Sequence, residues 1–205
     1  MARKALILVD IQNDFCPGGT MGISDADEVL EPANRLAEEF AARGDIVLAT
    51  KDSHPKNHAS FASSHEGAKP WDVIEYEGRQ RTLLPDHCID GTPGAEFHPE
   101  LRLDLVEKIF KKGTGVNYDS YSGFFDNDQK NKTGLDEYLR ENEVEEVWVV
   151  GLTSGRCVKA TATDAVKHGF KTIVYAPACR ASGVEKDGGK QAFEDMAAAG
   201  CEVIW

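Results

Sequence analysis

Short apolar runs that alternate with amphipathic segments are the feature that most restricts the fold of this chain. Strands of this kind, when helices link them, form a parallel sheet that is covered on both faces. We therefore expect a three-layer α/β/α fold with a doubly wound, mostly parallel sheet of about six strands. The predicted strands are Ala5–Val9, Ile46–Ala49, Val106–Phe110, Val147–Val150, Thr172–Tyr175 and Glu202–Ile204.

Four segments with helical periodicity lie between these strands. They are Ala26–Arg43, Gly134–Glu141, Cys157–His168 and Lys186–Ala199. Gly44 is expected to end the first helix, and Thr133 is expected to cap the second, in which Asp136 and Arg140 form an i,i+4 pair. A chain of 205 residues is expected to form one domain, residues 1–205.

Composition excludes several classes of protein. The formal net charge is −12, which argues against binding to nucleic acid or to an anionic membrane. Asp10 interrupts the first apolar run, so this run predicts a cytosolic strand and not a signal peptide. The five cysteines are odd in number and form no C-x-x-C motif, which favours reduced thiols in the cytoplasm.

The region from residue 54 to 100 is long, rich in Pro, Gly and His, and has no clean periodicity. Loops of this length in compact domains are usually functional or disordered, and the aromatic and histidine content here favours function. In addition, parallel sheets place their sites at the carboxyl ends of strands. Reactive groups are therefore expected after Val9, Ala49, Phe110 and Val150.

A metal site is suggested by the motif Asp52-x-His54, which follows the second strand. Side chains two residues apart in an extended segment project to the same side, and this pair suits Zn²⁺, Fe²⁺ or Mn²⁺. His87 is the best candidate for a third ligand, with His58 as an alternative or a supporting group. Ser60 is placed to bind a water on such a metal. The motif alone also fits an ordinary loop cap.

Three further residues suggest nucleophilic chemistry. A carboxylate such as Asp10 is costly to bury without a partner, although a turn cap explains it equally well. Of Lys111 and Lys112, alternation predicts that one enters a cleft, where an ammonium lowers the pKa of a nearby thiol. Cys157 lies at the expected start of a helix, whose N–H groups favour a thiolate. A solvated lysine pair and a cysteine that only fills space are the alternatives.

Taken together, the strand-end motifs resemble the nicotinamidase/pyrazinamidase branch of the isochorismatase-like hydrolases. The resemblance runs nearly end to end, in order and at compatible spacing. The motifs that carry it are D-I-Q-N-D-F-C-P-G-G, T-K-D-S-H-P-K-N-H-A-S-F-A, L-P-D-H-C-I-D-G-T-P-G-A-E-F-H-P, K-K-G-T-G-V-N-Y-D-S-Y-S-G-F-F-D-N and V-V-G-L-T-S-G-R-C-V-K-A-T-A-T-D-A.

This resemblance implies an Asp-Lys-Cys triad that hydrolyses a carboxamide through a thioester. Asp10 would be the general base and acid, Lys112 the activating cation and Cys157 the nucleophile. The implied metal ligands, Asp52, His54 and His87, would hold a divalent ion, most simply Zn²⁺, that positions the pyridine nitrogen of nicotinamide. The resemblance also implies that the chain can assemble into a homo-oligomer.

The implied substrate pocket has an oxyanion hole at the nucleophile's own N–H and near a cis peptide at Leu152–Thr153. Its aromatic walls would be Phe15 and Tyr121. The family commonly places Trp where this chain has Leu84, and Trp71 is the expected substitute for that wall.

Two more departures from the family pattern lie beside the nucleophile, at Gly155 and Arg156. They motivate an alternative function, the hydrolysis of a different small amide or ureido compound. A third hypothesis is a catalytically idle member of the family that serves as a scaffold.

Overall fold

Six parallel strands form the central sheet of the computed structural model, which describes residues 3–183, 187 and 189–205. In spatial order they are β5 (Lys108–Lys112), β2 (Ile46–Asp52), β1 (Arg3–Val9), β6 (Val144–Leu152), β7 (Lys171–Arg180) and β8 (Glu202–Ile204). Every neighbouring pair in this sheet is parallel. The predicted α/β architecture is therefore confirmed.

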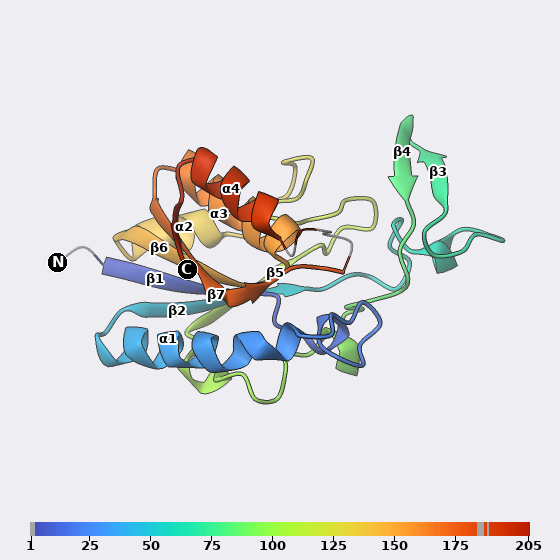
Figure 1. Cartoon of the computed structure of the whole chain (residues 1–205). Helices are drawn as coiled ribbons and strands as arrows, with labels where there is room; N and C mark the ends of the chain where they lie inside the picture. Colours follow the sequence, from blue (N-terminus) through green and yellow to red (C-terminus); the bar gives the residue numbers. More distant parts are fainter. Residues whose placement is uncertain (1–2, 184–186, 188) are drawn as a thin grey trace.

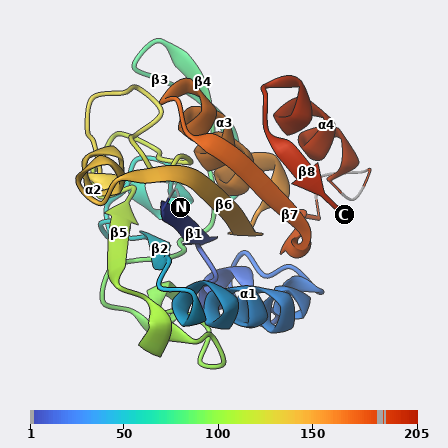
Figure 2. The same ribbon diagram turned by 90° about the vertical axis from the view of Figure 1, so that its left-hand side faces the viewer.

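The helices cover both faces of the sheet. Helix α1 (Leu30–Ala42) lies on one face, and α2 (Leu135–Glu141), α3 (Lys159–Lys167) and α4 (Lys190–Ala198) lie on the other (Figures 1 and 2). Helix α1 follows a 3-10 turn, Ala26–Val29, so the first predicted helix begins in a tighter conformation. The predicted start of the last helix, Lys186, lies outside the described residues. The N-cap of α2 is Gly134 instead of Thr133, although the Leu135 N–H donates to the Thr133 hydroxyl over 3.1 Å.

Strand β1 lies in the interior of the sheet, between β2 and β6, and its residues from Ala5 to Val9 have no exposed surface. A strand with helices on both sides has no wet face, which explains why its sequence is apolar throughout. Because β1 is deeply buried, Asp10, which follows it, also lies in the interior of the protein.

Strands β2 and β5 extend beyond their predicted carboxyl ends. Thr50, Lys51 and Asp52 continue β2, although all three are polar, because pairing with β5 satisfies their backbone groups. In this register Asp52 lies opposite Lys112, the last residue of β5. The pairing of two polar strand ends thus brings a carboxylate and an ammonium to the same edge of the sheet.

A β-hairpin occurs in the region that the sequence predicts to be irregular. Strands β3 (Val73–Tyr76) and β4 (Arg79–Thr82) pair antiparallel and stand apart from the central sheet (Figure 1). The turn residues Glu77 and Gly78 both have positive φ, 50° and 73°, which matches the right-handed twist of the two strands. The two strands are short and largely polar, so their sequence gives little strand signal. No helix among the described residues is both long and apolar enough to cross a bilayer.

The amino-terminal edge of the sheet is held by the buried carboxylate of Glu146 in β6. It accepts ion pairs from Lys4 at 2.6 Å and Lys171 at 2.8 Å, and a hydrogen bond from the Trp148 indole at 2.8 Å. Burial raises the pKa of Glu146, but these three donors outweigh it and lower the pKa to about 2. The carboxylate thus connects β1, β6 and β7.

We expect this carboxylate to contribute to stability in acid. An unfolded glutamate takes up a proton near its ordinary pKa, whereas the folded one resists until about pH 2, so the contribution is complete above pH 5 and is lost as the pH falls toward 2. Glu146→Gln should lower the free energy of unfolding at pH 6 by about 1 kcal/mol, because the two lysines are partly solvent-screened. It should also flatten the pH dependence in urea unfolding. The exposed Glu145→Gln is the control, and equal pH dependence in wild type and Glu146→Gln would contradict this prediction.

Candidate active site

Four strand ends deliver side chains to one point at the carboxyl edge of the sheet. Asp10 follows β1, Asp52 ends β2, Lys112 ends β5 and Cys157 lies shortly after β6. One ligand atom each from Asp10, Asp52 and Cys157 lie within 4.8 Å of one another. The structure therefore brings together the acid, the amine and the thiol that the sequence singles out.

The ammonium of Lys112 is the centre of this cluster. Its Nζ lies 2.8 Å from an oxygen of Asp10, 2.7 Å from Asp52 Oδ1 and 2.8 Å from the Ser120 carbonyl, and the Cys157 sulfur is 3.5 Å away. The lysine side chain has no exposed surface. Burial lowers the pKa of Lys112, but the two carboxylates outweigh it and raise the pKa well above its usual value. Its neighbour Lys111 points outward and pairs with Asp90, as strand alternation predicts for one lysine of the two.

Asp10 is completely buried in a left-handed backbone conformation, with φ of 48°. Besides the Lys112 ammonium, the Thr50 hydroxyl donates to its Oδ1 over 2.7 Å. Burial raises the pKa of this carboxyl, the adjacent ammonium lowers it, and the net direction is upward. A carboxylate with a raised pKa is a better proton acceptor than an ordinary aspartate.

Cys157 lies in a π-helical turn, Ser154–Val158, that leads directly into α3. Burial raises the pKa of its thiol well above the ordinary value; Lys112 opposes this effect, while Asp10 and Asp52 add to it. The sequence predicts that a nearby cation and the helix start hold a thiolate. In the structure burial is the largest effect, and the upward shift of the pKa favours the neutral thiol over the thiolate.

Asp52, His54 and His87 form a second cluster, with ligand atoms within 4.8 Å of one another. Nδ1 of His54 is 2.9 Å from the Gly113 carbonyl, and Nδ1 of His87 is 2.8 Å from the Pro85 carbonyl. A carbonyl only accepts, so each ring carries its proton on Nδ1 and leaves Nε2 as a lone-pair donor. This is the arrangement that metal-bound histidines adopt. The three residues therefore fit a divalent metal ion.

The alternative ligand His58 has a different environment. Its Nδ1 accepts from the Ser60 N–H over 3.2 Å, and its Nε2 lies 3.3 Å from the Tyr118 carbonyl. Both ring nitrogens are therefore engaged with the backbone. His58 packs against the His54 ring instead, with 4.6 Å between ring centroids, and the Ser60 hydroxyl donates to Asp119 over 2.5 Å.

A small cavity of about 50 Å³ opens between the two clusters. Its lining includes four residues that the sequence assigns to substrate binding, Phe15, Tyr121, Leu152 and Thr153, and the peptide bond between the last two is cis. The other lining residues are Asp52, His54, Leu84, His87, Asp119, Ser120, Arg156 and Cys157. The sequence identifies Leu84 and Arg156 only as departures from the family pattern. It does not identify Asp119 and Ser120, because no motif marks these two residues as part of a site.

Trp71 does not reach this cavity. The residue is 56% exposed, and its backbone N–H donates to the carbonyl of Leu83, which directly follows β4. The expectation that Trp71 replaces a missing aromatic wall is therefore corrected, because its segment turns away from the sheet before β3 begins. Leu84, at the position where the family commonly has Trp, lines the cavity.

Comparison with known proteins gives a consistent result. Residues 4–205 match the isochorismatase domain family. A nicotinamidase from Escherichia coli strain K12 is 42% identical over 98% of this chain and 93% of its own length. Among solved structures, a nicotinamidase/pyrazinamidase from Acinetobacter baumannii is 42% identical, with a TM-score of 0.89 over 100% of this chain and 96% of its own. A pyrazinamidase from Pyrococcus horikoshii in complex with zinc is 33% identical, with a TM-score of 0.80 over 98% of each chain.

The backbone of Gly113 leaves room for the imidazole of His54. Gly113 has φ of +66°, and a Cβ at this position would lie 2.7 Å from His54 Nδ1. We expect Gly113→Ala to displace the ring and to lower metal affinity by about 10- to 100-fold without removing a ligand. Competition with a chelator, followed by metal analysis, measures this affinity. Gly91→Ala is the matched control, because Gly91 also has positive φ but no atom lies within 4 Å of a Cβ there. Equal affinity of both variants would show that His54 is not held in this way.

The charge of Lys112 should also determine stability. Lys112→Met leaves two buried carboxylates without their cation, and we expect the free energy of unfolding to fall by about 3–5 kcal/mol. Adding Asp10→Asn and Asp52→Asn should recover part of this loss, because the amides are neutral. Urea unfolding measures each variant. Lys111→Met, at an exposed position, should stay within about 0.5 kcal/mol of wild type. A similarly small effect of Lys112→Met would refute the central role of its charge.

Proposed function

The chain belongs to the isochorismatase family, and we propose that it hydrolyses nicotinamide to nicotinate and ammonia through a thioester on Cys157. The observation that carries this proposal is the buried contact of Lys112 with Asp10, Asp52 and Cys157, beside a cavity that the metal-ligating cluster also lines. Nicotinamidases that match nearly the whole chain support the same activity.

Asp10 is assigned the proton transfers. The neutral thiol of Cys157 first gives its proton to Asp10, and the sulfur attacks the carboxamide carbon. Asp10 then returns the proton to the nitrogen, so that ammonia leaves and a thioester remains. A water molecule gives a proton to Asp10 and its oxygen attacks the thioester, and Asp10 reprotonates the sulfur as the carboxylic acid is released. One residue thus serves as base and acid in both halves of the reaction.

Lys112 is assigned a role in charge compensation. When a proton moves from sulfur to Asp10, negative charge moves from the carboxylate to the sulfur, and both atoms are neighbours of the same ammonium. The ammonium therefore stabilises the charge at either position with little rearrangement. The oxyanion of the tetrahedral intermediate would be bound by the N–H of Cys157 and an N–H near the Leu152–Thr153 peptide.

The residues Asp52, His54 and His87 would hold a divalent metal ion in this proposal. Such an ion would supply a Lewis acid that fixes the pyridine nitrogen and so orients the ring. Zn²⁺ is favoured by the ligand types and by the zinc in the Pyrococcus horikoshii structure, while Fe²⁺ and Mn²⁺ suit the same ligands. Phe15 and Tyr121 would form the walls for the aromatic ring.

The remaining properties of the protein stay proposals. We expect the binding partner to be a small-molecule amide substrate, and we expect no nucleic acid or membrane partner. Assembly of the chain into a homo-oligomer is a further prediction. All five cysteines are free and buried, which supports the cytoplasm as the proposed location.

We expect Cys157→Ala to reduce ammonia release from nicotinamide by at least about 10³-fold, because no other nucleophile is proposed in the cavity. Cys201→Ala, at a buried cysteine outside both clusters, should retain wild-type turnover. Ammonia is measured by a coupled assay with purified, metal-loaded protein. If Cys157→Ala hydrolyses nicotinamide as fast as wild type, the thioester mechanism is wrong.

The same assay separates the alternatives when it includes pyrazinamide and several non-pyridine amides and ureido compounds. A clear preference for a non-pyridine substrate would favour a different amidase of the same family. Absence of turnover with every compound, together with no bound metal, would favour the idle scaffold.

A further inference from the structure

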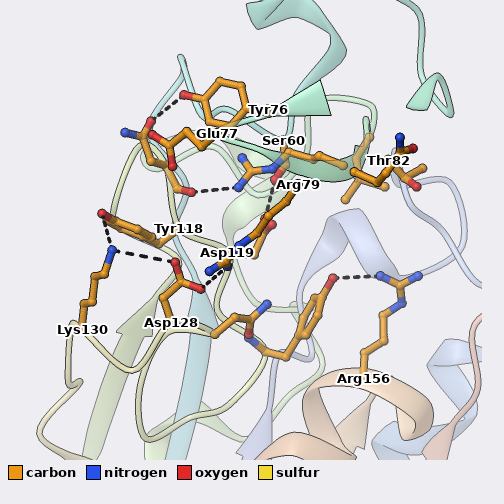
Figure 3. Close-up of a pocket in the computed structure, with 16 residues that line it drawn as sticks. Ser60, Tyr76, Glu77, Arg79, Thr82, Tyr118, Asp119, Asp128, Lys130 and Arg156 are labelled. Atoms are coloured by element: carbon orange, nitrogen blue, oxygen red, sulfur yellow. Dashed lines mark hydrogen bonds and ion pairs between the residues drawn. The ribbon is translucent and has the colours of Figure 1, made fainter. Parts of the chain in front are cut away.

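A second and larger cavity lies directly outside the substrate cavity. It has a volume of about 420 Å³ and extends to the β3–β4 hairpin (Figure 3). The two cavities share four lining residues: Leu84, Asp119, Tyr121 and Arg156. We call the larger one the outer cavity; the proposed reaction does not use it. A substituent on a bound substrate ring that points toward the shared wall would enter this outer cavity.

Most cations of the outer cavity are already engaged by the protein. Arg79 and Lys130 both approach Asp128, at 3.0 Å and 3.9 Å, and Lys130 also donates to the Tyr118 hydroxyl over 3.1 Å (Figure 3). Arg81 donates from Nη2 to the Asn117 carbonyl over 3.0 Å and lies over the Tyr76 ring, although its buried Nη1 has no hydrogen-bond partner. These groups lie on the hairpin side of the cavity and hold its outer wall in place.

Arg156 is engaged differently. Its Nη1 donates to the Tyr121 hydroxyl over 3.1 Å, and its guanidinium carbon is 5.6 Å from the centre of the same ring. No carboxylate among the described residues lies within ion-pair distance of it. A guanidinium has five N–H donors, so a neutral phenol leaves most of them available. Arg156 also directly precedes Cys157 and lines both cavities, as Figure 3 shows for the outer one.

We propose that the outer cavity is a second subsite, in which Arg156 and the Tyr121 hydroxyl bind a carboxylate carried by the ring of the substrate. The substrate class then includes aromatic carboxamides with an anionic substituent, which react as nicotinamide does and release one ammonia. This inference rests on the proposed amide hydrolysis and extends its specificity.

The charges around the subsite decide how selective it is. The protein has a net charge of −12, which disfavours anions in general, so a local cation is needed to admit one. Arg156 supplies planar, bidentate donors that match a carboxylate. Asp119 lies on the same shared wall with its oxygen bound to Ser60, and its charge opposes an anion. Arg156 is therefore expected to strengthen the binding of an anionic substituent, and Asp119 is expected to weaken it.

The experiment compares two substrates of similar size. One is nicotinamide with a carboxylate on ring carbon 5, and the other carries a neutral acetyl group at that carbon. The quantity measured is the ratio of their kcat/KM values, so that a general loss of activity cancels. Arg156→Gln should lower this ratio by about 10- to 100-fold, and Arg156→Lys should restore part of it. Asp119→Asn should raise the ratio.

Arg79→Gln is the matched control, because it removes a cation of the outer cavity that Asp128 already neutralises. It should leave the ratio within about twofold of wild type. A binding measurement that does not depend on turnover uses pyridine-3,5-dicarboxylate in calorimetry, where Arg156→Gln should weaken binding by a similar factor.

The outcomes separate this inference from the proposed function. If nicotinamide is hydrolysed but Arg156→Gln changes neither the ratio nor the binding of the dicarboxylate, the second subsite is refuted and the amidase remains. If the dicarboxylate binds in an Arg156-dependent way while nicotinamide itself is not hydrolysed, the subsite is supported and the proposed activity fails. Equal effects of Arg79→Gln and Arg156→Gln would also overturn the assignment, because the effect would then be one of general charge.

Discussion

The buried ammonium of Lys112 is the interaction on which the candidate site depends. The carboxylates of Asp10 and Asp52 come from different strands and would repel each other in the buried interior. Each would also be costly to bury alone. Lys112 lies within 2.8 Å of both and keeps a backbone carbonyl as its third acceptor. The strand ends β1, β2 and β5 are thus joined by one cation, and the thiol of Cys157 is placed beside it. Stability and chemistry at this edge of the sheet have the same physical origin.

Asp52 extends this network to the metal-ligating cluster. Its Oδ1 contacts Lys112, while its Oδ2 lies 3.7 Å from Nε2 of His54. Burial raises the pKa of this carboxyl, but Lys112 and His54 outweigh burial and lower the pKa, so the carboxyl stays ionised. One carboxylate therefore serves both the cluster that would hold a metal and the cluster that would form the thioester. Members of both clusters line the same small cavity.

Reaction and specificity are carried by different parts of the fold. The groups assigned to the reaction lie at or shortly after the ends of the sheet strands, where strand pairing holds the backbone. The outer cavity is built by the β3–β4 hairpin and by loops, which the sheet does not constrain. Loops on a rigid scaffold can vary without disturbing the chemistry beneath them. Arg156 and Leu84, two of the three positions at which the sequence departs from the expected family pattern, lie on the wall that the two cavities share.

The sequence pattern was enough to predict a mostly parallel sheet of about six strands and the reactive residues that follow them, because apolar runs that end abruptly in Asp, His or Lys are local features. The hairpin was missed because its strands are short and polar, and Trp71 was misplaced because the path of a long loop depends on contacts far along the chain. Four features of the site depend on the folded chain: Lys112 faces inward opposite Asp52, both nitrogens of His58 are engaged, burial raises the pKa of the Cys157 thiol, and Arg156 meets Tyr121. Each of these depends on strand register or on burial among distant segments, and no local pattern of residues encodes either.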